Sequence, residues 1–234
     1  MKQFVKSIFG RFGYSIHKKR STDYFVGFHS SFLSQIFQPY TVIDVGVGYG
    51  THALYEAFPK ARFILVEPLK EYKSAIDKIM KDYDHTVYYK AVSDKSGKQE
   101  IIIDTKDFET SSLETRTSLT TTGHLLEKRM IEVTTLDDIL RENPIMKRPI
   151  LLKIDAEGHE LKALEGARIL LQSIDMVIAE VSIAKRFEGS YEFEDLILFM
   201  KENGFYLLTF LKVTHLEGEL RPRFVDVVFK RREN

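Results

Sequence analysis

The stretch Thr41–Gly50 reads T-V-I-D-V-G-V-G-Y-G, and it decides the fold. Its first half is a short β-branched run that ends in an acid, and its second half has glycines at alternate positions. This pattern predicts a buried strand that runs into a tight loop, with a helix that begins near Thr51. Glycines let the backbone take unusual dihedral angles and let a ligand approach without a Cβ in the way. Backbone N–H groups at the start of the helix favour an electronegative ligand, so this loop is the first candidate binding site.

The composition is that of an ordinary globular protein with one sizeable core. Of its 234 residues, 44% are hydrophobic and 29% are charged, and Lys+Arg and Asp+Glu both number 34. Balanced charge gives no argument for a nucleic-acid partner. The absence of Cys excludes a disulfide scaffold, a thiolate metal site and a Cys nucleophile. No apolar run approaches the ~18 residues of a membrane span, and the first residues lack the apolar core of a signal peptide. We therefore predict a cytoplasmic protein without a transmembrane segment.

Residues 1–40 are expected to form a helical extension of the main domain, which spans residues 41–234. The first apolar side chains lie on one face of a predicted helix: Phe4, Val5, Ile8, Phe9 and Phe12. The main interpretation is a helix that packs on the main domain. The alternative is a basic amphipathic helix that contacts a membrane surface. A second helical pattern follows at Phe25–Phe37.

Apolar strands and helical patterns alternate along the rest of the chain. After the first strand, the predicted strands are Arg62–Val66, Thr86–Val92, Glu100–Ile103, Ile150–Asp155, Met176–Glu180, Phe205–Leu211 and Val225–Lys230. Strands separated by helices predict a mostly parallel sheet that is covered on both faces. The last two strands follow each other without a helix, which predicts an antiparallel pair at one edge. We therefore expect an α/β, doubly wound, Rossmann-like domain.

Residues 105–130 have no clear period and are longer than a usual connection. This polar stretch is either functional or a mobile surface loop. In the functional interpretation, Ser111–His124 closes over a bound substrate as a lid.

Acids stand at or just after the carboxyl ends of five strands: Asp44, Glu67, Asp94, Asp155 and Glu180. Ligands of doubly wound sheets bind at these strand ends. A single acid there is usually a helix cap, whereas five in one pattern, beginning at a glycine loop, indicate a binding site.

Glu67 lies about twenty residues beyond the glycine loop, where a carboxylate can accept both hydroxyls of a ribose. The ligand is therefore expected to contain a nucleoside, and NAD and S-adenosylmethionine (SAM) are the two candidates. The NAD signature places its last glycine further along than the Gly46-x-Gly48-x-Gly50 spacing found here. Asp44 is unfavourable beside a pyrophosphate but suits an ammonium or sulfonium group. These residues favour SAM as the ligand.

Ser93 and Asp94 follow the third predicted strand and are placed to meet an adenine. A carboxylate accepts from the exocyclic amine, and a hydroxyl can serve a ring nitrogen. The alternative is an Asx turn that leads into Gly97.

A second cluster of polar residues, K-I-D-A-E-G-H-E, occupies residues 153–160. Asp155, Glu157 and His159 alternate, so an extended segment would aim their side chains the same way. The alternative interpretation makes Glu157 and Glu160 acids of a first helical turn, where they favour the helix dipole. It does not require His159, whose near-neutral pKa suits a proton acceptor.

Several motifs resemble the FkbM-type methyltransferases, from about Thr41 to Lys230. They are D-V-G-V-G-Y-G-T, V-E-P, A-V-S-D-K-S-G, S-S-L, T-L-D-D-I-L, L-L-K-I-D-A-E-G-H-E-L-K-A-L-E-G-A and V-D-V-V-F-K-R. The resemblance implies a seven-stranded SAM-dependent class I methyltransferase fold and O-methylation, often of a sugar hydroxyl in a glycan or natural product. By motif position it also implies a role for each of five residues: Asp44, Gly46 and Gly48 in the loop, Glu67 on the ribose and Asp155 near the methyl donor.

We therefore expect a SAM-dependent O-methyltransferase that acts by in-line displacement on a hydroxyl of a sugar, a glycan or a related small molecule. His159 is the predicted base, and Asp155 or Glu157 orients it or the acceptor. Alternatively, Asp155, Glu157 or His159 would hold a Mg²⁺ ion together with Glu180.

Two other function classes stay open at this point. A nicotinamide-dependent oxidoreductase would need the longer glycine spacing and a hydride acceptor site. A nonenzymatic nucleoside-binding module would keep the glycine loop and Glu67 without needing His159.

Overall fold

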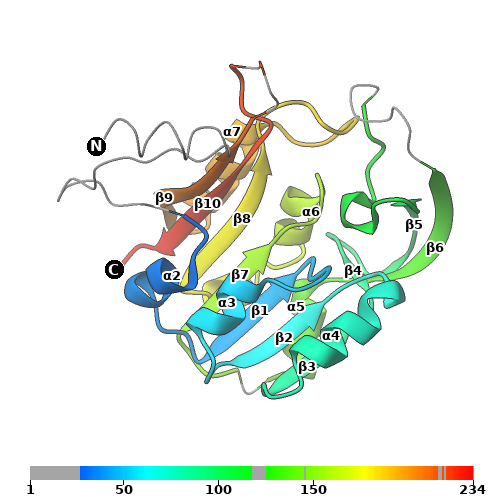
Figure 1. Ribbon diagram of the computed structural model, residues 1–234. Coiled ribbons are helices and arrows are strands. Elements are labelled where there is room, and N and C mark those ends of the chain that lie inside the picture. Colours follow the sequence, from blue (N-terminus) through cyan, green and yellow to red (C-terminus); the bar gives the residue numbers. More distant parts are fainter. Residues whose placement is uncertain (1–26, 118–124, 145, 216–217, 219, 234) are drawn as a thin grey trace, which may run out of the picture.

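A seven-stranded sheet forms the centre of the protein, whose computed structural model describes residues 27–117, 125–144, 146–215, 218 and 220–233. Its strands are β1 (Thr41–Val45), β2 (Arg62–Val66), β3 (His85–Tyr88), β7 (Ile150–Ile154), β8 (Met176–Ser182), β9 (Phe205–Thr214) and β10 (Phe224–Arg231). The spatial order is β3-β2-β1-β7-β8-β10-β9 (Figure 1). The first five strands of this order are parallel, and β10 is antiparallel to both β8 and β9. The predicted doubly wound, seven-stranded sheet with an antiparallel edge pair is confirmed.

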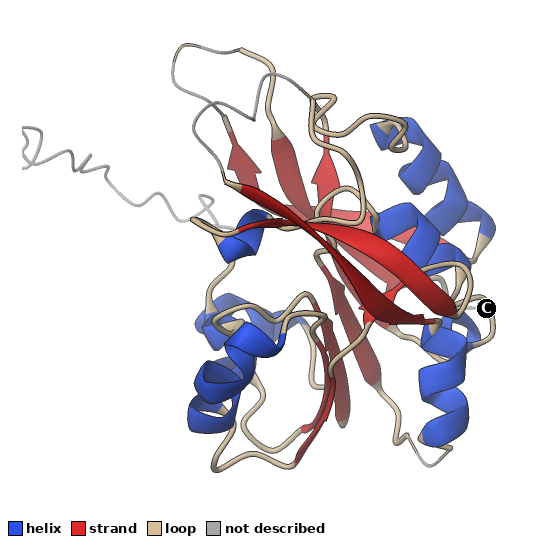
Figure 2. Cartoon of the chain, turned by 90° about the vertical axis from the view of Figure 1, so that its right-hand side faces the viewer, coloured by secondary structure: helices blue, strands red, loops and turns tan. Residues whose placement is uncertain are grey.

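Helices cover both faces of this sheet (Figure 2). One core contains side chains of α5 (Leu136–Glu142), α6 (Glu160–Glu165) and α7 (Phe193–Glu202). The other core contains side chains of α2 (Ser30–Ile36), α3 (His52–Ala57) and α4 (Lys73–Ile79). Successive residues of a strand point to opposite faces, so Ile43 of β1 lies in the first core and Val42 in the second. Burial on both faces explains why the central strands are apolar along their whole length.

A second sheet of three strands lies beside the main one. It contains β4 (Ala91–Val92), β5 (Gly97–Asp104) and β6 (Leu126–Thr134), in the order β4-β6-β5. The prediction of one strand over Thr86–Val92 is wrong, because β3 pairs with β2 in the main sheet whereas β4 pairs with β6. The predicted antiparallel pairing of Glu100–Ile103 is confirmed within β5 and β6.

The polar stretch at residues 105–130 contains more structure than its sequence pattern predicts. The short 3-10 helix η2 (Phe108–Thr110) follows β5, and Ser112 forms a bridge with Ile102. Residues 126–130 belong to β6. Residues 118–124 lie outside the described part of the chain, so the lid interpretation stays a prediction.

The N-terminal extension is described only from residue 27 onward. Helix α2 is shorter than the predicted Phe25–Phe37 helix and packs against α3. The predicted amphipathic helix and its membrane contact fall on residues 1–26, outside the described residues. Within the described part of the chain, no helix has the length and apolar character needed to cross a membrane.

The strand order reverses beside β1. The chain passes from β1 to β2 on one side, and β7 pairs with β1 on the other side. Ligands of open α/β sheets bind at such a reversal, outside the carboxyl ends of the strands. The fold therefore places the glycine loop, which follows β1, at the expected binding edge.

Candidate active site

A cavity of about 500 Å³ opens at the carboxyl ends of the parallel strands. Eight of the predicted site residues line it: Gly46, Gly48, Gly50, Glu67, Asp155, Glu157, His159 and Glu180. Parallel strands end at one edge of a sheet, which explains why residues so far apart in the sequence meet. The other three predicted residues, Asp44, Ser93 and Asp94, are not among the residues that line this cavity.

The glycine loop makes a close contact with the loop that follows β7. Gly46 has a φ of 74°, in the left-handed region that favours glycine. An added Cβ at this position would lie 1.8 Å from the backbone oxygen of Asp155. The two loops are also joined by a hydrogen bond from the Asp155 N–H to the Val45 carbonyl, at 3.2 Å. A glycine at position 46 therefore allows the glycine loop and the loop after β7, which both line the cavity, to lie in contact.

Glu67 lies at the end of β2 with its carboxylate held by two backbone groups. Oε2 accepts from the Gly48 N–H and Oε1 accepts from the Leu69 N–H, each at 2.9 Å. Burial raises the pKa of Glu67 to about 7, although these two N–H groups act in the opposite direction. The side chain is thus fixed against the glycine loop, and its carboxylate keeps further lone pairs for hydroxyl donors.

Asp44 is fully buried beneath the glycine loop. Tyr55 Oη donates to Asp44 Oδ2 at 2.7 Å, and Lys153 Nζ lies 3.4 Å from Asp44 Oδ1. The same Lys153 ammonium donates to the Gly46 carbonyl at 2.8 Å and lies 3.6 Å from Asp155 Oδ2. Lys153 therefore links Asp44, the glycine loop and Asp155. Sequence reasoning expected Lys153 only to snorkel or to form a pair, although a lysine inside the buried strand I-L-L-K-I was a signal for a larger role.

His159 lines the cavity and is buried, with 3% of its surface exposed. Its Nε2 lies 2.8 Å from Ser93 Oγ, and its Nδ1 lies 2.7 Å from Glu114 Oε1. Ser93 Oγ in turn donates to Asp94 Oδ1 at 3.0 Å. The structure thus joins three predicted site residues. Both ring nitrogens are engaged, so His159 must release one of these contacts before it can take a proton from a substrate.

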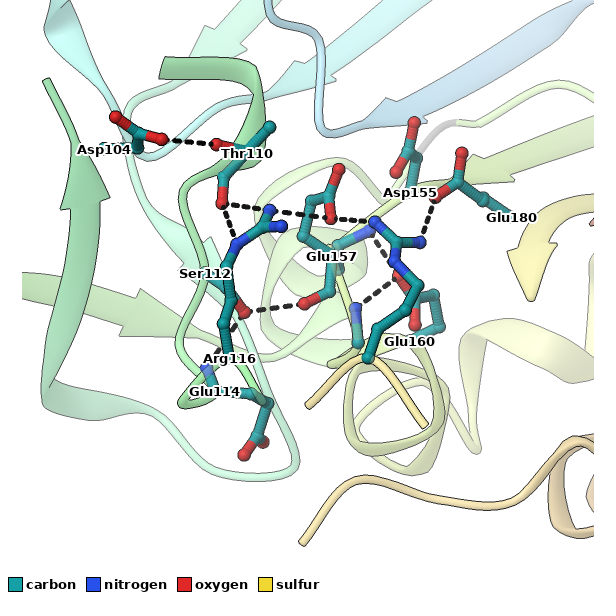
Figure 3. Close-up of polar contacts among 12 residues, drawn as sticks. Asp104, Thr110, Ser112, Glu114, Arg116, Asp155, Glu157, Glu160 and Glu180 are labelled. Atoms are coloured by element: carbon teal, nitrogen blue, oxygen red, sulfur yellow. Dashed lines mark hydrogen bonds and ion pairs between the residues drawn. The ribbon is translucent and has the colours of Figure 1, made fainter. Parts of the chain in front are cut away.

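Glu157 lies in a turn and has a φ of 48°. Because of this turn, the predicted extended arrangement of Asp155, Glu157 and His159 is wrong, although all three line the cavity. Arg116 Nη2 lies 3.3 Å from Glu157 Oε2, and Ser112 Oγ donates to the Glu157 carbonyl at 2.6 Å (Figure 3). The segment that follows η2 is therefore tied to the turn after β7.

Arg186 connects two of the cavity acids. It donates to Glu157 Oε2, and its Nη1 donates to Glu180 Oε1 at 2.8 Å. Burial raises the pKa of Glu157 to about 7, and Arg186 acts in the opposite direction. No sequence motif singled out Arg116 or Arg186, because their shared partner Glu157 lies 41 and 29 positions away in the chain.

Oxygen atoms of Asp155, Glu157 and Glu180 all lie within 4.8 Å of one another. Three carboxylates suit a hard cation such as Mg²⁺. Arg186, however, already bridges Glu157 and Glu180, and its positive charge opposes a cation between these carboxylates. As built, the cluster does not fit a metal, and Mg²⁺ dependence stays a prediction.

Comparison with known proteins identifies the family. Residues 44–207 match the family model described as the methyltransferase FkbM domain. The chain belongs to the FkbM methyltransferase family. The resemblance inferred from the sequence motifs is thereby confirmed. No curated protein matches the chain.

The solved structures that match this FkbM-family protein are distant from it in sequence. The methyltransferase FkbM from Methylobacillus flagellatus KT has a TM-score of 0.53 and 16% identity, and the match covers 88% of this chain and 48% of that one. This chain therefore spans about half the length of that protein. A putative O-methyltransferase from Klebsiella pneumoniae has a TM-score of 0.48 and 12% identity, with 98% and 89% covered. Magnesium protoporphyrin IX methyltransferase from Synechocystis PCC 6803, with bound SAM, has a TM-score of 0.44 and 11% identity, with 97% and 78% covered.

Proposed function

We propose that this FkbM-family protein is a SAM-dependent O-methyltransferase whose acceptor is a hydroxyl of a sugar, a glycan or a related small molecule. The observation that carries the proposal is the position of Glu67. Its carboxylate is held against the glycine loop by the Gly48 N–H, in the wall of the cavity. A fixed carboxylate at the end of the second strand suits the two hydroxyls of a ribose.

The residues of the donor half fit SAM in shape and charge. An added Cβ at Gly48 would meet no atom closer than 3.8 Å, so a ligand can approach the backbone there. Glu67 accepts hydrogen bonds from the ribose. The bound donor supplies an activated methyl group on a positively charged sulfur. The acids of the cavity favour that charge. Asp44 does not line the cavity, and we assign it a supporting role beneath the loop through Lys153.

A second hydrogen-bonded group supports the cavity wall and consists of Ser93, Asp94 and His159. The hydrogen bond between Ser93 and His159 joins the loop after β4 to the start of α6. Ser93 and Asp94 do not line the cavity, so we assign them a supporting role: with His159 they hold the loop after β4, next to Ala91 and Val92, which do line it. A direct contact of Ser93 or Asp94 with the adenine stays a prediction. The role of His159 as the base remains a prediction, because it requires one of its two contacts to open.

The acceptor half suits a neutral, hydroxylated molecule. The acids that line the cavity outnumber the lysines: Glu67, Glu109, Asp155, Glu157, Glu180 and Asp226 against Lys90, Lys153 and Lys212. Carboxylates accept hydrogen bonds from hydroxyl groups but repel phosphate and carboxylate groups. Asp155 lies where the two halves meet, beside Gly46, and would orient the acceptor toward the methyl group.

Calorimetry with SAM, S-adenosylhomocysteine (SAH) and NAD tests the donor. We expect SAM and SAH to bind and NAD to bind at least 100-fold more weakly; tighter binding of NAD would overturn the proposal. Glu67→Gln should weaken SAH binding about tenfold, because an amide presents one acceptor oxygen instead of two. Glu56→Gln, an exposed substitution on α3, is the matched control and should leave binding unchanged.

The acceptor class is tested with methyl-labelled SAM and a panel of neutral glycans, nucleotide sugars and small alcohols. Transfer to a hydroxyl of a neutral glycan or a small alcohol supports the proposal, whereas transfer to nucleotide sugars alone would overturn the neutral acceptor. Transfer only to amines, to nucleic acid or to protein side chains would overturn the O-methylation part of the proposal.

A further inference from the structure

A row of charged side chains crosses the carboxyl side of the main sheet from β7 to β9. Asp226 of β10 is the register partner of Glu180 in β8 and of Lys212 in β9. Asp155 directly follows β7, which pairs with β8. All four side chains line the cavity. The cavity therefore extends along this row, away from Glu67 and toward the side of the sheet where an acceptor would lie.

Asp226 differs from the other acids of this row in its contacts. Glu180 is bound to Arg186 at 2.8 Å, and Asp155 lies 3.6 Å from the Lys153 ammonium. Within the described residues, the Asp226 carboxylate has no hydrogen bond and no ion pair. A carboxylate oxygen of Asp226 can thus receive a proton without first releasing a protein partner, whereas the carboxylates of Glu180 and Asp155 are each paired with a cation.

We propose that Asp226 is the general base that takes the proton from the acceptor hydroxyl. This inference rests on the proposed methyl transfer. The acceptor oxygen forms a C–O bond with the methyl carbon, while the C–S bond breaks and its electron pair stays on sulfur. The hydroxyl proton moves to a carboxylate oxygen of Asp226, SAH leaves, and the proton then passes to water. An alcohol needs such a base because its own proton is weakly acidic.

The charges around Asp226 suit this role. Burial, followed by repulsion from Asp155, raises the pKa of Asp226 to about 6, while Lys212 and Lys153 act in the opposite direction. Glu180 faces Asp226 from β8. At pH 7 the carboxylate is mostly ionised yet more basic than an ordinary aspartate, and a base with a pKa near the working pH is the more effective one. His159, in contrast, has both ring nitrogens engaged.

A binding experiment tests the position of Asp226 without any acceptor. SAM and SAH differ by one methyl group and one positive charge, so a carboxylate that faces the methyl group stabilises SAM alone. We expect Asp226→Asn to lower the ratio of SAM to SAH affinity about three- to tenfold in calorimetry. Asp84→Asn removes one exposed carboxylate just before β3, at the opposite edge of the sheet, and should leave the ratio unchanged. Equal ratios in the two variants would overturn the inference.

A rate experiment tests the proton transfer with the acceptors that wild type methylates in the labelled-SAM panel. Asp226→Asn should lower kcat about 100-fold, the usual effect of losing a general base. Full activity of Asp226→Asn, with activity lost in His159→Gln, would assign the base to His159 instead. If wild type binds neither SAM nor SAH, the proposed function itself fails. If wild type binds both and Asp226→Asn changes neither ratio nor rate, only the assignment of Asp226 fails.

Discussion

Replacing Gly46 with alanine tests the contact between the two loops of the cavity. An alanine in the left-handed region costs about 1–2 kcal/mol. The added Cβ would also lie 1.8 Å from the Asp155 carbonyl oxygen, so the two backbones must separate by about 1.5 Å to reach ordinary contact. That movement breaks the hydrogen bond from the Asp155 N–H to Val45 and the one from Lys153 to the Gly46 carbonyl. At about 1 kcal/mol for each hydrogen bond, we expect a total loss of about 3–4 kcal/mol.

Gly189→Ala is the matched control for the backbone strain. Gly189 has a φ of 68°, close to that of Gly46, and no atom lies within 4 Å of an added Cβ. Its substitution should therefore cost only the strain of about 1–2 kcal/mol. The difference between the two variants isolates the contact with the Asp155 loop.

Urea unfolding followed by circular dichroism measures both losses, and calorimetry measures SAH binding. Gly46→Ala should unfold at a clearly lower urea concentration than Gly189→Ala and should bind SAH at least 100-fold more weakly than wild type. Gly189→Ala should bind SAH normally, since Gly189 does not line the cavity. Equal urea midpoints, or normal SAH binding by Gly46→Ala, would refute the reasoning about this contact.

Three further substitutions or conditions have definite expected outcomes. Tyr55→Phe removes the donor to the buried Asp44 carboxylate and should lower the free energy of unfolding by about 1–3 kcal/mol, measured in urea; an unchanged midpoint would contradict the support role of this pair. Arg186→Met leaves the two buried acids that it bridges without a cation and should cost about 3–5 kcal/mol at pH 8. The loss should be smaller at pH 5.5, because Glu157, whose pKa is about 7, is protonated there, and burial raises the pKa of Glu180 as well. A larger loss at pH 5.5 would contradict this expectation. The pKa of Glu67 is about 7 in the free protein, and ribose hydroxyls favour the ionised carboxylate, so SAH affinity should rise as the pH increases from 6 to 8 in calorimetry; a flat profile would speak against a ribose contact.

The local pattern of the sequence predicted the fold well because each helix and each strand has its own hydrophobic period. Alternating apolar strands and helices indicated the doubly wound sheet, and the absence of a helix between the last two strands indicated the antiparallel edge. The break between β3 and β4 was not predicted, because no turn residue interrupts Thr86–Val92. The strand that pairs with each half lies elsewhere in the chain: β2 for β3 and β6 for β4.

The sequence by itself determined the side of the cavity that the glycine loop and Glu67 form. The spacing of Gly46, Gly48 and Glu67 follows from a strand, a loop and the next parallel strand, and parallel strands bring their carboxyl ends to one edge. Asp155 was found for the same reason, because β7 is another parallel strand that ends in an acid. Spacing along the sequence is enough to predict which residues meet wherever parallel strands follow one another, because each such strand brings its carboxyl end to the same edge of the sheet.

Only the tertiary structure decided what surrounds these residues. The buried Asp44 carboxylate is in contact with Tyr55 and Lys153. Arg186 forms ion pairs with Glu157 and Glu180, two acids that lie 23 positions apart. Asp226 enters the cavity because β10 inserts between β8 and β9, with bulges in that pairing. Strand order and register depend on contacts between distant segments, and no local hydrophobic period encodes these contacts. The part of the cavity lined by β8, β10 and β9 is built from them.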